Sequence, residues 1–420
     1  MNIRTFCKRF LFSLIAFLLV LVVYLAGGEI YARIKHGQRI AVEINESVFR
    51  QADFQLHHSL IPNARGFSIK KEWQVPYLIN SFGFRDRDYT YEKPANTFRI
   101  LVLGDSFTEG HGVEIEQTFA KIFEKKLNQR PGQNIDYEVI NCGVGGYSPL
   151  LEYLLLSEKA LQFKPDMVVI CYDFTDLYDD YEYAKTTFFD KDGLPLKCIP
   201  YKRIRSYSSN PLERFLIRHS RFYVYTESRI NKKLFKMRYG LKRGSELDGF
   251  FAVDKTSPSA AKKLWEEDGK LYELRYQPKQ DPEPDGFVAY REGQKQTAER
   301  FWEQNKKYLG LSYEILKKQG IPLVLVSYPH AIEVSTSEWV EGRLLRELEA
   351  GKIYQQPKVV NRLGQFAEEN QITFINLYPY FKASDTHPLY YDFDGHFNQN
   401  GHRLAAEGLL KSFLKTGLIN

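Results

Sequence analysis

Short apolar runs of strand length alternate along this 420-residue sequence with segments that repeat apolar residues at helical spacing. The runs that predict strands are 98–103, 137–141, 166–172, 322–327 and 372–377. The segments that predict helices are 118–129, 148–163, 295–318, 361–370 and 399–415. Strands separated by helices pair in parallel, and a parallel sheet is covered by helices on both faces. The alternation therefore predicts an α/β fold with a mostly parallel sheet, whose sites form at the carboxyl ends of the strands.

An uncharged and strongly apolar stretch occupies residues 10–26, near the N-terminus. With Gly27 and Gly28 it would form a helix of roughly 28 Å, which is about the thickness of one hydrocarbon core. Basic residues precede it, and the positive-inside rule keeps such a flank in the cytoplasm. We expect a single-pass helix in a cell inner membrane, with the rest of the chain on the extracytoplasmic, periplasmic side. A cleaved signal peptide is the alternative.

Composition limits the partners and cofactors of this chain. The formal net charge is +6, but residues 1–36 hold five basic residues against one acidic residue, so the remainder carries only +2. A nucleic-acid partner is therefore not predicted. The four cysteines show no paired CxxC spacing, so neither a metal site nor a disulfide framework is predicted, although a single disulfide stays open. No cofactor is implied.

The first predicted strand runs directly into residues 104–110, with the sequence GDSFTEG. The glycine permits a sharp turn, which would expose the hydroxyl of Ser106 at the open edge of the sheet. A loop that only caps the next helix is the alternative for this string by itself. After a strand, however, the segment resembles block I of the GDSL/SGNH hydrolases. The resemblance implies Ser106 as the nucleophile and Asp105 as a supporting neighbour.

Residues 141–147, with the sequence NCGVGGY, follow the second predicted strand. Glycines let backbone amides approach a reacting carbonyl, where they stabilise an oxyanion. The resemblance implies this role for the amide of Gly146, together with the amide of Ser106. A glycine-rich turn into the next helix is the alternative, and it is compatible with that role.

The chain departs from the family after the third predicted strand. The family has Gly-x-Asn-Asp there, with the asparagine as a further oxyanion donor, whereas residues 173–176 read Asp-Phe-Thr-Asp. Thr175 therefore stands in the asparagine position, and Asp176 follows it as a second supporting carboxylate. A threonine hydroxyl is a shorter donor, and loss of one such donor typically lowers turnover ~10²-fold or more. The departure bears on activity rather than on fold.

Residues 392–402, with the sequence DFDGHFNQNGH, precede the last predicted helix. The family carries its catalytic Asp-x-x-His here, but that spacing would put the acid at Phe393, which has no carboxylate. An Asp-x-His spacing looks like that of some polysaccharide O-acetyltransferases in the wider superfamily. This resemblance implies Asp394 as the partner of the general base His396, and Asp392 stays open as the other candidate.

The other histidines are assigned no chemistry. His402 falls inside the last predicted helix and is expected to be structural, and His111 is expected to be a loop residue. His57 and His58 lie in a polar stretch without further candidate ligands, so no metal site is predicted there.

We divide the chain into three parts. Residues 1–28 form the membrane anchor or signal peptide, 29–97 an extracytoplasmic N-terminal segment, and 98–416 an SGNH hydrolase-like domain with a three-layer, flavodoxin-like fold. Residues 177–294 are an insertion in that domain, and within 214–243 apolar residues recur at helical spacing among basic ones. Such a helix either packs on the domain with a solvated basic face or contacts anionic lipid or an acidic glycan.

The resemblance implies an exported serine esterase or O-acyltransferase that acts on O-acyl groups of a carbohydrate, with O-acetyl favoured, through an acyl-serine intermediate. The anchored N-terminus, residues 80–86 (NSFGFRD) and Tyr328-Pro329 are similar to exported bacterial members linked to polysaccharide O-acetylation or deacetylation. Transfer would need a membrane-bound acyl donor protein or an external donor. Two alternatives stay open: a lipid esterase or thioesterase, and a non-catalytic glycan-binding component of a polysaccharide assembly complex.

Overall fold

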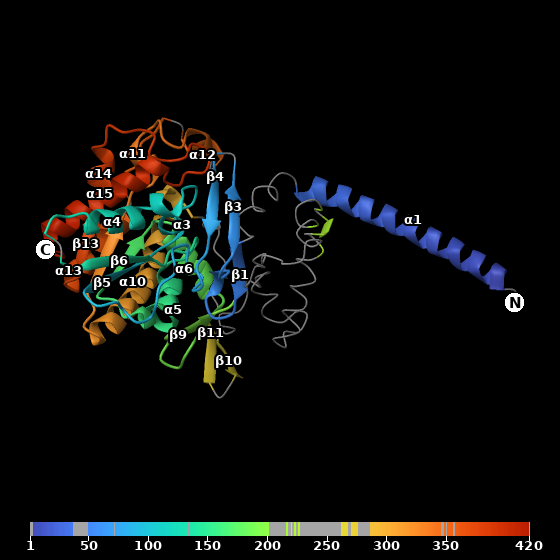
Figure 1. Ribbon diagram of the computed structural model, residues 1–420, viewed down its shortest axis with the longest axis horizontal. Helices are drawn as coiled ribbons and strands as arrows, with labels where there is room; N and C mark the ends of the chain where they lie inside the picture. The colour runs from blue at the N-terminus through green and yellow to red at the C-terminus, as the bar shows by residue number, and fades with distance from the viewer. Residues whose placement is uncertain are drawn as a thin grey trace.

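The computed structural model describes most of the chain outside the long insertion. The described residues are 3–36, 49–70, 72–132, 134–200, 216, 220, 222–223, 226, 262–267, 270–275, 286–345, 348–349, 351–355 and 358–419. Figure 1 shows a sheet flanked by helices, with the N-terminal helix α1 (Ile3–His36) extending away from it.

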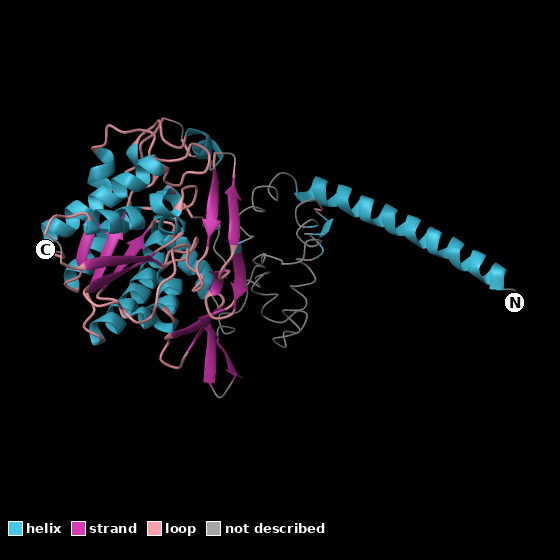
Figure 2. Ribbon diagram, in the orientation of Figure 1, coloured by secondary structure: helices cyan, strands magenta, loops and turns pink. Residues whose placement is uncertain are grey.

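A five-stranded parallel sheet forms the centre of the α/β domain (Figure 2). Its strands are β5 (Thr97–Leu103), β6 (Asp136–Asn141), β7 (Met167–Tyr172), β12 (Leu323–Ser327) and β13 (Thr373–Asn376). In space they follow the order β6-β5-β7-β12-β13. This is the 2-1-3-4-5 order of flavodoxin-like doubly wound folds. The predicted α/β fold with a mostly parallel sheet is confirmed.

Helices cover both faces of this sheet. One face carries α4 (Phe119–Asn128) and α15 (Gln399–Thr416), which contact each other. The other face carries α5 (Pro149–Glu158), α6 (Asp176–Ala184), α10 (Lys295–Lys318) and α13 (Lys358–Glu369). From β5 the chain crosses to the neighbouring edge strand β6, and from β6 it returns across β5 in the opposite direction to β7. Right-handed crossovers in opposite directions put their helices on opposite faces, which explains the two layers.

Shorter helical segments connect these elements. The short α-helices are α3 (Ser106–Glu109), α11 (Ala331–Val334), α12 (Val340–Leu345) and α14 (Tyr378–Lys382). Turns of 3-10 helix are Ile115–Gln117, Ala160–Phe163, Val288–Tyr290 and Glu292–Gln294. One of them corrects the predicted helix over 148–163, which ends as α-helix at Glu158 and continues as 3-10 helix after a break at Lys159.

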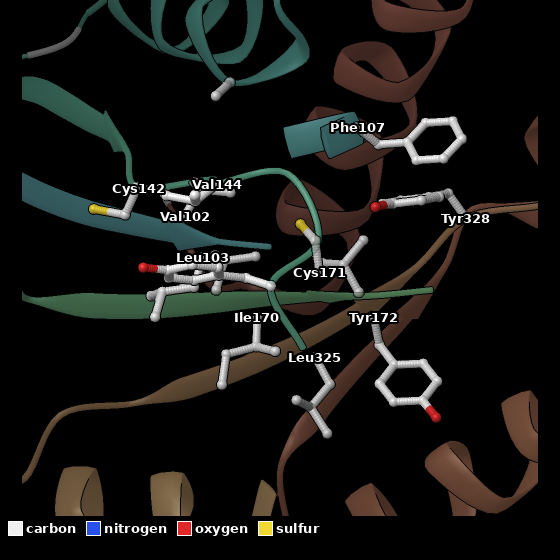
Figure 3. Close-up of a cluster of buried hydrophobic side chains, with 14 of the residues drawn as sticks. Val102, Leu103, Phe107, Cys142, Val144, Ile170, Cys171, Tyr172, Leu325 and Tyr328 are labelled. Carbon is white, nitrogen blue, oxygen red and sulfur yellow. The ribbon is translucent and has the colours of Figure 1, made fainter. Parts of the chain in front are cut away.

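The strands of the central sheet are buried because helices cover them on both sides. All six residues of β7 and all five of β12 are buried, as is the carboxyl half of β5. Figure 3 shows Val102, Ile170 and Leu325, from three neighbouring strands, in one apolar cluster. Close packing of this kind holds the strand ends, and with them the sequence motifs, in fixed relative positions.

Residues 49–78 form two antiparallel hairpins that apolar periodicity does not predict. The strands are β1 (Arg50–Asp53), β2 (His57–Leu60), β3 (Arg65–Ile69) and β4 (Gln74–Leu78). In Figure 1, β1, β3 and β4 lie along the side of the α/β domain that faces α1. Arg85, which follows them, is fully buried and donates hydrogen bonds to the carbonyl oxygens of Glu109 at 3.1 Å and Pro76 at 3.3 Å. The segment is therefore packed onto the domain.

The described part of the insertion adds a small antiparallel sheet in the order β10-β11-β8-β9. Its strands are β8 (Thr187–Phe189), β9 (Pro195–Cys198), β10 (Lys262–Glu267) and β11 (Lys270–Arg275). The amphipathic helix expected within 214–243 lies for the most part outside the described residues, and its role stays a prediction.

Helix α1 has the length and composition of a membrane span. Its stretch Arg9–Tyr31 has 23 residues and a mean hydropathy of 2.7, and the rest of the molecule buries none of the apolar window. A signal sequence near an N-terminus has the same properties. The helix is therefore a candidate span.

Candidate active site

The GDSFTEG motif forms a tight turn at the carboxyl end of β5. Gly104 has a φ of +157°, and a Cβ atom here would overlap the side chain of Thr108. Ser106 is the first residue of α3. The Asp105 carboxylate caps this helix by accepting a hydrogen bond from the Phe107 amide at 2.9 Å. The turn therefore holds Ser106, half-buried, at the edge of the sheet.

A chain of hydrogen bonds connects Ser106, His396 and Asp394. The Nε2 atom of His396 lies 2.7 Å from the Oγ atom of Ser106, which is 290 residues away in the sequence. The Nδ1 atom of the same imidazole is bonded to the Oδ1 atom of Asp394. Asp392, the other candidate acid, instead accepts a hydrogen bond from the Val340 amide at 2.5 Å. The structure thus pairs His396 with Asp394.

Asp394 is held in its ionised form by two basic neighbours, His396 and Lys70. Burial acts to raise the pKa of this carboxyl, but the His396 imidazole and the Lys70 ammonium outweigh burial, so the pKa lies well below its usual range. The Nζ atom of Lys70 is 2.9 Å from Oδ2, the oxygen that does not meet His396. An ionised carboxylate in this position can orient an imidazole and stabilise its protonated form.

Two further histidines lie near these residues, and the backbone amide of one of them, His111, donates a hydrogen bond to the Ser106 carbonyl at 3.2 Å. His402 is buried in α15, where its Nδ1 atom accepts a hydrogen bond from the Phe119 amide at 3.2 Å, and burial lowers its pKa to about 3. It is neutral and helical, as expected of a structural residue. The ring of His111 lies in the turn after α3, 4.9 Å from the ring of His396.

The two expected amide donors belong to neighbouring loops. Among the described residues, neither the Ser106 amide nor the Gly146 amide has a hydrogen-bond partner, which leaves both open to a ligand. Gly146 has a φ of +81°, and its carbonyl accepts a hydrogen bond from the Tyr183 hydroxyl at 2.6 Å. The Val144 amide, two residues earlier, donates to the Gly104 carbonyl at 3.0 Å. This bond connects the glycine-rich loop of residues 141–147, called the glycine loop below, to the turn that carries Ser106.

Thr175 is engaged within its own turn. Its amide donates to the Oδ1 atom of Asp173 at 2.6 Å. Burial, with a smaller effect of the nearby Asp105 carboxyl, raises the pKa of Asp173 to about 7. Asp176 closes the same turn by accepting a hydrogen bond from the Asp173 amide at 3.1 Å. The backbone of Thr175 is thus held by the Asp173 carboxylate.

Asp105 holds the turn that carries Ser106 in place through two hydrogen bonds. Besides capping α3, its Oδ1 atom accepts a hydrogen bond from the Tyr328 hydroxyl at 2.8 Å. Figure 3 shows the rings of Tyr328 and Phe107 beside each other at the end of the sheet, and their centroids are 5.1 Å apart. Burial raises the pKa of Asp105. Tyr328 comes from the end of β12, so this bond links two strand ends.

Glu109, the sixth residue of the motif, is a fully buried carboxylate that no sequence signal marked. It accepts hydrogen bonds from the Gly145 amide at 2.5 Å, from the Arg50 guanidinium at 3.0 Å and from the Tyr77 hydroxyl. Burial acts to raise the pKa of Glu109, but Arg50 and His111 outweigh burial and lower it to about 2. The carboxylate joins the N-terminal hairpins to the glycine loop.

The structure shows no metal cluster in its described part, that is, no group of three or more His, Cys, Asp or Glu side chains that could hold an ion. Cys142, Cys171 and Cys198 are buried free thiols. His57 and His58 are hydrogen-bonded to each other through their Nδ1 atoms at 2.9 Å, and the Nε2 atom of His58 lies 3.0 Å from the Gly145 carbonyl. These two histidines support the glycine loop.

No protein-family model matches this chain, and no curated protein matches it. Solved structures similar to it include a member of the lipolytic protein G-D-S-L family from Veillonella parvula, at 12% identity and a TM-score of 0.32, covering 76% of this chain and 99% of that chain. A GDSL-like lipase from Bacteroides thetaiotaomicron has 12% identity and a TM-score of 0.34, covering 78% and 93%. A catalytic mutant of an acetylxylan esterase from Geobacillus stearothermophilus has 13% identity and a TM-score of 0.35, covering 75% and 93%.

Replacing Glu109 by glutamine should destabilise the fold at pH 7 by about 3 kcal/mol, because the Arg50 guanidinium loses its counter-charge in a nearly dry site. Folding lowers the pKa of Glu109 to about 2, so its stabilising effect is complete above the ordinary value of 4.5 and declines as the pH falls toward 2. Urea unfolding of the full chain in detergent at pH 7 and at pH 3 measures both effects.

The matched control for this change is Glu92→Gln. Glu92 pairs with Lys164 on the surface at 2.7 Å, and its side chain is 83% exposed. Its replacement should leave the unfolding midpoint nearly unchanged. Equal midpoints for Glu109→Gln and wild type at pH 7 would contradict the assigned role of Glu109.

Proposed function

We propose that this chain is an exported, membrane-anchored serine esterase that acts on O-acyl groups of a carbohydrate, with O-acetyl as the favoured group. The observation that carries the proposal is the row of hydrogen bonds from Ser106 through His396 to Asp394 at the carboxyl end of β5. Nucleophile, base and orienting acid are the three parts that acyl transfer to a serine requires. The carbohydrate class and the acetyl group rest on the resemblance of the sequence motifs.

The reaction proceeds in two halves. The Oγ atom of Ser106 attacks the acyl carbon, while the Nε2 atom of His396 takes the hydroxyl proton and Asp394 stabilises the imidazolium. The amides of Ser106 and Gly146 donate to the oxyanion of the tetrahedral intermediate. Collapse breaks the ester bond, and His396 returns the proton to the departing sugar oxygen. Water, activated by the same base, then hydrolyses the acyl-serine; a second sugar hydroxyl in place of water would make the chain an O-acyltransferase.

Replacing either Ser106 or His396 by alanine should abolish nearly all turnover of an acetyl ester, and the double variant should be little worse, because the two residues act as a unit. Asp394→Asn should cost less than either, since the carboxylate never takes the proton. The measurement is hydrolysis of acetylated sugars by the full chain, with intact mass after treatment with a serine-directed phosphonate as a second readout.

His402→Gln serves as the control, and it should lower stability while largely preserving turnover. A folded His396→Ala variant with wild-type turnover would contradict the assignment of the base. Longer acyl esters and thioesters in the same assay test the lipid esterase or thioesterase alternative. Faster hydrolysis of these substrates than of the acetylated sugars would favour it. A folded wild-type chain that hydrolyses no ester and takes no phosphonate on Ser106 would favour the non-catalytic, glycan-binding alternative.

The oxyanion donors can be tested at Thr175, the position of the family asparagine. Thr175→Asn introduces a longer amide donor, and we expect turnover to rise, by up to the ~10²-fold that one such donor contributes. Thr175→Val, which removes the hydroxyl donor, should lower turnover. Steady-state rates on a small acetyl ester measure both variants. Unchanged turnover in Thr175→Asn would remove this position from the proposed oxyanion site.

The location of the domain is a separate part of the proposal, supported by the apolar helix α1 and its basic flank. A reporter that is active only outside the cytoplasm should be active when fused after Asn420. The protein should also stay with the membranes during an alkaline wash. Release of a soluble, shortened species would show instead that the helix is a cleaved signal peptide.

A further inference from the structure

We propose that Lys70, in the turn between β3 and β4, is a positioning residue for the pair Asp394 and His396. The inference rests on the proposed function, since it concerns how the base of that reaction is held. Lys70 would act through Asp394 and would not touch the substrate. None of the four sequence motifs contains it.

Each oxygen of the Asp394 carboxylate has its own partner. Its Oδ1 atom meets His396, and its Oδ2 atom lies 2.9 Å from the Nζ atom of Lys70. The side chains of Lys70 and Asp394 are only 15% and 13% exposed, so water and salt screen this pair weakly. A carboxylate held at both oxygens cannot rotate away from the imidazole.

The same hairpin also holds the backbone of the acid. The carboxylate of Glu72 accepts hydrogen bonds from the Phe393 amide at 3.0 Å and from the Asp394 amide at 2.8 Å. This brings a second carboxylate close to Asp394, and two such charges repel each other. The Lys70 ammonium offsets that repulsion. Its removal would therefore disturb the acid in two ways, by freeing Oδ2 and by leaving two carboxylates together.

The position of the ammonium is fixed by its own hairpin. The Lys70 amide donates to the Trp73 carbonyl at 3.0 Å, which closes the turn between β3 and β4. The Nζ atom of Lys70 lies 5.0 Å from the centre of the Trp73 ring, and the Trp73 indole N–H is bonded to the Ser68 hydroxyl at 3.0 Å. The Trp73 ring also packs on Tyr391, three residues before Asp394, at 4.7 Å between centroids. Lys70 is thus presented to Asp394 by a constrained turn.

The charge of Lys70 has a consequence for the base. A nearby ammonium disfavours the gain of a further positive charge in the site, so its removal should shift the pH dependence of the reaction of Ser106 upward. The titratable groups that face the pair are Lys70, Glu72, Asp105, His111, Tyr391 and His402, with Asp392 on the same loop. Of these, Lys70 is the ammonium bonded to Asp394.

The test measures the rate constant for modification of Ser106 by a fluorophosphonate between pH 5 and pH 9, using the full chain in detergent. Lys70→Met should lower the plateau rate by about 10-fold to 100-fold, the size of effect that small misplacements of catalytic groups produce. The pH at which the rate reaches half of its plateau should also move upward. Lys70→Arg, which keeps the charge, should restore both values toward wild type.

Lys93→Met is the matched control, because Lys93 forms a similarly half-buried pair with Asp166, at 2.5 Å, away from Ser106. It should leave the plateau and the midpoint unchanged. A merely structural role of Lys70 would lower the rate equally at all pH values, and such a result in a chain with a normal unfolding midpoint overturns the inference. So does a rate profile of Lys70→Met that coincides with wild type.

The proposed function fails in a different way. A folded wild-type chain that takes no fluorophosphonate on Ser106 at any pH overturns the esterase proposal, and the inference about Lys70 falls with it. If Lys70→Met does not fold, Lys70→Gln and Lys70→Arg decide the matter. A charge-dependent difference between those two in the pH midpoint supports the inference, and identical profiles overturn it.

Discussion

A carboxylate that leaves water and stays ionised must meet a cation or several hydrogen-bond donors, because its desolvation otherwise costs more than a fold can offset. Two such carboxylates hold the loops of this site: Glu109 beside the glycine loop and Asp394 beside His396. Their cations, Arg50 and Lys70, both come from the hairpins that precede the α/β domain. The geometry at Ser106 therefore depends on a segment that carries none of the sequence motifs.

The predicted parts of the fold are those with a strong local signal. The central strands β7 and β12 are nearly continuous apolar runs because the sheet is covered on both sides, and α10 begins and ends where apolar periodicity predicts. The hairpins of residues 49–78 had no such signal. A strand such as β2 contains two histidines and a serine, and it is stabilised by contacts with Gly145 and Tyr147 far along the chain. Pairing of that kind is decided by tertiary packing.

The site was predictable where a residue type at a fixed spacing carries the chemistry. Ser106, His396 and Asp394 follow from motifs, although spacing alone left Asp392 open because both aspartates lie on one loop. Thr175 shows the limit of such reasoning. Its motif position predicts an oxyanion donor, but the hydrogen bond that the structure gives Thr175 runs from its amide to the Asp173 carboxyl two residues earlier, and a motif position does not fix where a short hydroxyl points. Lys70 reaches Asp394 across 324 residues, a contact that no local pattern encodes.

The dependence on residues 49–78 also links the site to the N-terminal helix. Only residues 37–48 separate the end of α1 from the first residue that packs on the domain. Twelve residues span at most about 40 Å when fully extended. If α1 stays in the membrane, the hairpins, and therefore the loops that hold Ser106 and His396, remain within a few tens of ångströms of the bilayer surface.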